Sequence, residues 1–262
     1  MSSNTYDDEL NMSITCRDLK IFACTPFTMP ENFTLDSHDL IMWKDRKQIT
    51  YWQKRYAKKN INTILELGIA FGGSLVFLAD LYDVKTLVGI DIKDKDDNFL
   101  SKIKTSSFKD LITCYYNTSQ DDRDGLTEII NLHFPDGIDM VVDDASHFLK
   151  ETRDSFNIIF PFLNPGGCFV IEDYAWAHSR DFADISPPHF AGKPTMSQLA
   201  MELTALAAAR PDLISQIVID FNTISIRKGH AKVPQDFSIQ SESFTYASFD
   251  FPSLRKLGSK RK

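Results

Sequence analysis

The chain has 262 residues, 43% of them hydrophobic, which is enough to bury a substantial core in one domain. The formal net charge of −7 disfavours general nucleic-acid binding. No apolar run approaches the length of a membrane span, and the polar N-terminus has no apolar signal segment, so we expect a cytoplasmic protein.

The first part of the chain is polar, and we predict an N-terminal arm over residues 1–37 without assigned chemistry. Residues 38–60 have a helical pattern, with Ile49 and Trp52 at helical spacing. Basic side chains that include Lys44 crowd this segment. We expect them to form a solvated helix face, and a site for a polyanion is the alternative.

A buried strand is predicted over residues 63–68, followed by a loop with glycines and an apolar helix. Glycine lets the backbone turn sharply and approach a ligand closely, although a tight strand-to-helix turn needs glycine in any case. The spacing is G-x-x-x-G-G, not the G-x-G-x-x-G of dinucleotide sites. The strand, loop and helix still suit a protein that binds an adenosine-bearing cofactor. The residues assigned to this cofactor site are Glu66, Gly68, Gly72, Gly73 and Ser74.

The next predicted strand covers residues 86–92 and has Asp91 near its end. A carboxylate there is placed to bind the hydroxyls of a ribose. The alternative is a surface acid in a charged loop. A third strand, over residues 111–116, precedes Ser119 and Gln120, which either border an adenine or cap the following helix.

The apolar run of residues 138–142 ends in Asp143 and Asp144, and His147 follows three positions later. Such a run suits a strand buried on both faces of a parallel sheet, and ligands bind at the carboxyl ends of these strands. The alternative is that one of the two acids caps the next helix.

A second apolar strand, over residues 167–171, ends in Glu172 and Asp173. A helical pattern over residues 152–163 separates the two strands, so they are predicted to be parallel and adjacent. Because neighbouring strands lie ~4.8 Å apart, their terminal carboxylates can converge on one cation. Oxygen ligands from Asp144, Glu172 and Asp173 predict a magnesium-type site.

The remaining chain is predicted to contain an irregular substrate lid over residues 176–195 and a helix over residues 197–209. A β-hairpin over residues 215–228 closes the main domain, which spans residues 38–230. The last part, residues 231–262, is expected to be a tail that is partly disordered.

The glycine loop, Asp91 and the two carboxylate strands resemble the class I S-adenosylmethionine-dependent methyltransferases. Within that class the chain is most similar to metal-dependent O-methyltransferases that act on small molecules. The group that it resembles contains the macrocin and mycinamicin sugar O-methyltransferases, the rhamnosyl O-methyltransferases and the so-called cephalosporin hydroxylases. The shared motifs are E-x-G-x-x-x-G-G-S, D-D-x-S-H and P-G-G…(I/V)-E-D, and the likeness covers about residues 40–176. It implies a Rossmann-like α/β fold with a seven-stranded, mostly parallel sheet, helices on both faces and a C-terminal antiparallel hairpin.

The resemblance also implies S-adenosylmethionine and Mg²⁺ as cofactors and a small hydroxylated acceptor as substrate. It implies no nucleic-acid or membrane partner and allows a homo-oligomer. Asp144 is then the metal ligand, and Asp143 belongs to the cofactor side. His147 takes the position of the catalytic lysine of the more distant catechol O-methyltransferases. An imidazole titrates near neutral pH and suits a general base.

Two other classes of function stay open. One is a catalytically silent module that binds S-adenosylmethionine or a nucleotide and acts as a partner protein, although such a module has no need of the acids and histidine. The other is an NAD-dependent oxidoreductase, which the glycine spacing disfavours. The sequence does not identify the acceptor.

Overall fold

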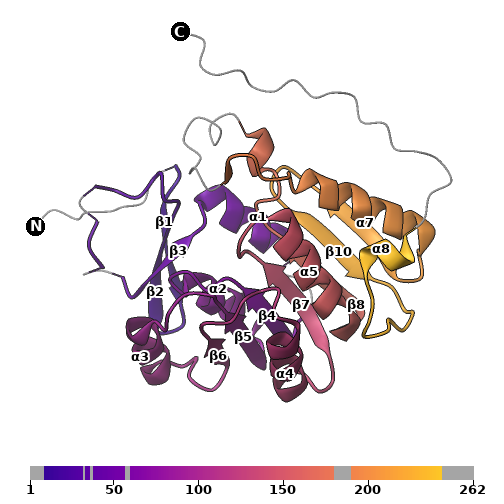
Figure 1. Cartoon of the computed structure of the whole chain (residues 1–262). Coiled ribbons are helices and arrows are strands. Elements are labelled where there is room, and N and C mark those ends of the chain that lie inside the picture. The colour runs from indigo at the N-terminus through magenta and orange to yellow at the C-terminus, as the bar shows by residue number, and fades with distance from the viewer. Residues whose placement is uncertain (1–8, 32, 36–37, 57–59, 180–189, 244–262) are drawn as a thin grey trace, which may run out of the picture.

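The computed structural model of the chain describes residues 9–31, 33–35, 38–56, 60–179 and 190–243 (Figure 1). Its centre is a seven-stranded sheet with the strand order β6-β5-β4-β7-β8-β10-β9. The first five strands in this order are parallel, whereas β10 runs antiparallel to both β8 and β9. This confirms the predicted fold class and the closing hairpin. The strands are β4 (Thr63–Leu67), β5 (Thr86–Ile90), β6 (Ile112–Tyr115), β7 (Ile138–Asp143), β8 (Leu163–Ile171), β9 (Ile214–Ile219) and β10 (Ile224–Lys228).

Helices cover both faces of the sheet because β7 and β8 present apolar side chains on both sides. Helices α4, α5, α7 and α8 contribute to one hydrophobic cluster, and in Figure 1 the first three lie in front of the sheet. Helices α1, α2 and α3 contribute to the cluster on the other face. The helices are α1 (Arg46–Tyr56), α2 (Gly73–Tyr82), α3 (Asp97–Thr105), α4 (Arg123–His133), α5 (Leu149–Ile159), α7 (Ser197–Ala209) and α8 (Ile239–Glu242). None of the described helices is both long and apolar enough to cross a membrane.

The N-terminal part holds more structure than the arm predicted from its polar sequence. A separate three-stranded sheet has the order β1 (Met12–Cys16), β2 (Leu19–Cys24), β3 (Leu40–Trp43). Buried side chains of these strands belong to the same hydrophobic cluster as α1 and α2. The helical pattern predicted from residue 38 therefore begins later than expected, because its first part forms β3.

The sheet topology brings the predicted site residues to one edge. The chain passes from β4 outward to β5 and β6, and then returns to the other side of β4 to form β7. In open α/β sheets ligands bind at the carboxyl ends of the strands where the order reverses. Here Leu67 pairs with Asp143, and Asp143 with Ile171, so the strand ends of β4, β7 and β8 lie level.

Candidate active site

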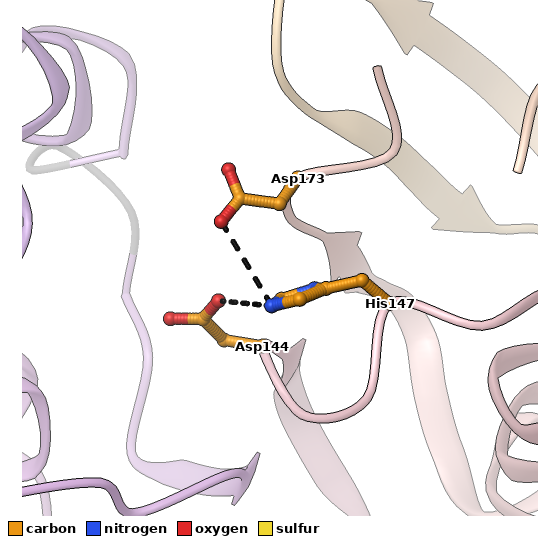
Figure 2. A group of neighbouring side chains, drawn as sticks. All are labelled: Asp144, His147 and Asp173. Carbon is orange, nitrogen blue, oxygen red and sulfur yellow. Dashed lines mark ion pairs between the residues drawn. The ribbon is translucent and has the colours of Figure 1, made fainter. Parts of the chain in front are cut away.

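Asp144, His147 and Asp173 form a compact group at the carboxyl ends of β7 and β8 (Figure 2). One ligand atom from each residue lies within 4.8 Å of the others, a spacing at which they could hold a metal ion. The Nε2 atom of His147 is 3.9 Å from Oδ1 of Asp144 and 3.9 Å from Oδ2 of Asp173. All three predicted residues thus come together.

Each of the two carboxylates is held from outside the group through its second oxygen. Lys44 donates from Nζ to Oδ2 of Asp144 at 2.8 Å. Asn222, in the turn between β9 and β10, donates from Nδ2 to Oδ1 of Asp173 at 2.6 Å. One oxygen of each carboxylate therefore faces His147, and the other fixes its orientation.

The backbone at the group is strained. His147 and Asp173 have φ angles of +57° and +52°, in the left-handed region that costs most residues free energy. Trp176 donates from its indole Nε1 to the carbonyl of His147 at 3.0 Å. This bond, made by a residue beyond β8, holds the strained turn in place.

Glu172, predicted as the third metal ligand, points elsewhere. It is 2% exposed, and its carboxylate accepts hydrogen bonds from Lys44 Nζ and, at 2.7 Å, from Trp52 Nε1. The structure therefore brings Asp144 and Asp173 together, with His147 as the third member of the group, while Glu172 lies behind them.

Lys44 corrects an expectation from the sequence. It was predicted to lie on a solvated helix face, but it follows β3, precedes α1 and is only 2% exposed. Burial lowers the pKa of its amine, and the carboxylates of Asp144, Glu172 and Glu66 more than offset this and raise the pKa well above its usual value. Lys44 is therefore a buried ammonium group inside the site.

Asp143 and Gln120 are packed behind the site. Asp143 is 2% exposed, accepts a hydrogen bond from Ser155 Oγ at 2.6 Å, and has its pKa raised by burial to about 6. Gln120 donates to both oxygens of Asp143 and accepts from the backbone N–H of Ser146. Ser119, expected near an adenine, donates to Asp121 and lines the large cavity. The polar contacts of Asp143 thus connect the end of β7 to α5 and to the loop before α4.

Asp91 holds the glycine loop. Its Oδ2 accepts the backbone N–H groups of Ile69 and Ala70 at 2.9 and 3.0 Å, and its Oδ1 accepts that of Lys93 at 2.9 Å. The carboxylate also lines the cavity, beside Gly68. Its remaining lone pairs are the ones that a ribose hydroxyl would use.

The glycines of the loop permit close packing of protein on protein. At Gly68 (φ +95°) an added Cβ would lie 2.3 Å from the carbonyl oxygen of Asp144. At Gly72 it would lie 2.2 Å from the ring of Phe99, and at Gly73 2.4 Å from the carbonyl oxygen of Ile41. Of these glycines, Gly68 contributes to the wall of the large cavity.

Glu66 is a buried acid whose carboxyl oxygens make no hydrogen bond to the described residues. It lies in β4, and its side chain is fully buried. Burial raises the pKa of Glu66 to about 8, and the charge of Lys44 offsets only part of this effect. Ser74, at the start of α2, is 9% exposed and lines a second small cavity with Lys44 and Asp144. A buried carboxyl group of this kind, which is not among the residues that line the two cavities, could bind an amino group only where a ligand reaches it past Ser74.

A cavity of about 1590 Å³ connects these features. Its lining includes Gly68, Asp91 and Ser119 as well as Asp144, His147 and Asp173. The aromatic residues that line the cavity are Phe27, Trp43, Phe148, Tyr174, Trp176, Phe190 and Phe221. Half of the predicted lid, residues 180–189, lies outside the described residues.

Residues 65–174 match the family described as "Methyltransferase domain", and this segment includes Gly68, Asp91, Asp144, His147 and Asp173. The matched segment runs from within β4 to just beyond β8 and is similar in sequence to methyltransferase domains.

Several curated relatives are named as O-methyltransferases. The chain is 32% identical over 145 residues to demethylmacrocin O-methyltransferase of Streptomyces fradiae, covering 53% of this chain and 33% of that protein. It is 28% identical over 150 residues to mycinamicin VI 2''-O-methyltransferase of Micromonospora griseorubida, covering 55% and 35%. The chain thus spans about a third of the length of these relatives.

A solved structure has the same fold. MycE methyltransferase from the mycinamycin biosynthetic pathway, in complex with Mg, SAH and mycinamycin VI, aligns with a TM-score of 0.52 and 22% identity. The alignment covers 71% of this chain and 50% of that one.

Proposed function

We propose that the chain is an S-adenosylmethionine-dependent, Mg²⁺-dependent O-methyltransferase that acts on a hydroxyl of a small molecule such as a sugar, a phenol or another natural product. The observation that carries the proposal is the position of Asp144, His147 and Asp173 on the same cavity as Gly68 and Asp91. The relatives named above are O-methyltransferases by name, and this supports the proposed reaction type. We place the catalytic domain at residues 38–230 and the protein in the cytoplasm.

The residues have distinct roles in this proposal. Asp91 binds the ribose of S-adenosylmethionine, and Glu66, whose carboxyl oxygens lack partners, receives the amino group of its methionine part. Asp144 and Asp173 supply the oxygens that a hard cation prefers. A bound divalent cation would lower the pKa of the acceptor hydroxyl and orient it.

His147 acts as the general base. Its Nε2 faces the cavity between the two carboxylates, so it can accept the hydroxyl proton as the oxygen attacks the methyl group. S-adenosylmethionine would supply the methyl group, with its demethylated thioether as the leaving group. The aromatic wall around His147 and Trp176 excludes water and holds the acceptor in line with the methyl group.

A methyl-transfer assay tests the proposal. The protein is incubated with S-adenosylmethionine labelled in the methyl group and a panel of glycosides and phenols, with Mg²⁺ or with a chelator. We expect transfer to at least one acceptor that is lost on chelation and restored by added Mg²⁺. Binding of the demethylated cofactor without transfer to any acceptor would favour the silent module, and full transfer after exhaustive chelation would reject the metal site.

A further inference from the structure

Lys44 places a positive charge where a divalent cation would act. Its ammonium group bridges Asp144, which faces the cavity, and Glu172, which is buried behind it. Trp52 occupies the other oxygen of Glu172, so the contacts of this carboxylate come from α1 and from the segment between β3 and α1. Lys44 and Trp52 together occupy both oxygens of Glu172, and the ammonium group of Lys44 balances the charge of this carboxylate without any metal.

A buried ammonium ion is costly unless carboxylates surround it. Lys44 meets this condition, since Asp144, Glu172 and Glu66 all interact with it. The same carboxylates lose much of their attraction for a second cation while Lys44 neutralises them, because an opposite charge at hydrogen-bond distance screens their negative potential.

We propose that Lys44 is a built-in cation that competes with the divalent metal for Asp144, while Glu172 holds the ammonium group in place, and so sets the affinity of the site for metal. This rests on the proposed function. In the metal-free protein Lys44 holds the two carboxylates in place and keeps the site folded. When metal is present, Lys44 limits how strongly it is held, since every carboxylate oxygen that it engages is less available to the metal.

The test measures Mn²⁺ binding to the metal-free protein by electron paramagnetic resonance, without S-adenosylmethionine or acceptor. We expect Lys44→Met to bind Mn²⁺ at least tenfold more tightly than the wild type. Lys44→Arg keeps the charge and should stay within about threefold of the wild type. An unchanged or weaker affinity in Lys44→Met would overturn the proposal, because a merely structural lysine gives no gain.

A second pair of variants covers the case in which Lys44→Met does not fold. Glu172→Gln and Lys44→Met/Glu172→Gln differ only in the lysine, and the double variant leaves no unpaired charge at Glu172. We expect the double variant to bind Mn²⁺ several-fold more tightly than Glu172→Gln, because Oδ2 of Asp144 is released. Equal affinity would again reject competition. If Mn²⁺ binds to no variant and not to the wild type, the metal part of the proposed function fails, and the proposal for Lys44 fails with it.

Lys228 provides a matched control for stability. It is another buried lysine, but it donates to the carbonyls of Pro161 and Leu163 and not to carboxylates. Without metal, Lys44→Met and Lys228→Met should both melt below the wild type. Saturating Mg²⁺ should restore Lys44→Met toward the wild type, and should raise Lys228→Met only by the shift seen for the wild type. Equal shifts in both variants would contradict competition at Asp144.

Discussion

At the scale of single residues, the site depends on how each carboxylate is divided between the scaffold and the cavity. Asp144 and Asp173 each give one oxygen to a fixed donor, Lys44 or Asn222, and direct the other toward His147. Such division fixes the orientation of the free oxygens before any ligand arrives. The arrangement therefore reduces the entropy lost when a metal or substrate binds.

The proposed role of His147 predicts a specific loss. His147→Ala should lower turnover by roughly 10²–10⁴-fold, the usual contribution of a general base, and leave the affinities for cofactor and Mn²⁺ nearly unchanged. Steady-state kinetics and calorimetry with the demethylated cofactor and Mn²⁺ measure the two effects. A variant that loses Mn²⁺ binding would instead make His147 a metal ligand.

Trp176 is expected to act through His147. Trp176→Phe keeps an aromatic ring in the cavity but removes the indole donor to the strained His147 carbonyl. A hydrogen bond of this kind contributes about 1 kcal/mol, so we expect kcat to fall about fivefold. Calorimetric affinity for the demethylated cofactor should not change. An unchanged kcat would show that the strained turn holds without Trp176.

At the scale of elements, the loop after β4 is fitted against the end of β7. Gly68→Ala would place a methyl group against the backbone of Asp144 at a φ of +95°. Strain and overpacking together should lower the free energy of unfolding by about 2–6 kcal/mol. Gly166 is the control, because it also has a positive φ (+79°) but open space around it, so Gly166→Ala should cost about 1–2 kcal/mol. Urea unfolding of both variants measures the difference, and equal costs would show that the contact with Asp144 is unimportant.

The elements of the main sheet were predictable because each carries its own local signal. Acids close the apolar runs of β7 and β8, and a polar turn separates β9 from β10. Both strand ends and the hairpin therefore follow from the sequence. The start of α1 did not follow, because β3 and α1 form one continuous helical-looking pattern.

The partners of the site residues could not be predicted in the same way. Lys44 lies 100 positions from Asp144, and Asn222 lies 49 positions from Asp173. No periodicity links such distant positions, and a lysine in a basic stretch is usually solvated. The direction of Glu172 depends on these contacts, so the sequence identified its place at the strand end but not its partners.

At the scale of the whole molecule, two hydrophobic clusters share one sheet. Strands β7 and β8 contribute side chains to both clusters, and β1 to β3 join the second of them. Because β7 and β8 contribute to both clusters, loss of packing on one face of the sheet should expose apolar side chains on the other face. The molecule should therefore unfold as one cooperative unit.

Calorimetry tests this cooperativity. We expect one thermal transition for the intact protein, and a rise in Tm of about 5–10 °C when the demethylated cofactor is present at a hundred times its dissociation constant. A ligand that binds only the folded state gives this shift. Two transitions, of which the cofactor moves only one, would contradict a single unit.

The contacts of Lys44, Trp52 and Asn222 also bear on how a minimal catalytic fragment could be cut. The segment that matches the methyltransferase family, residues 65–174, includes Asp144, Glu172 and Asp173 but none of their three donors. A fragment with those limits would keep every acid of the site and leave Glu172 as an uncompensated charge in an apolar interior. The smallest piece of this chain that retains the geometry of the site runs from β3 to β10.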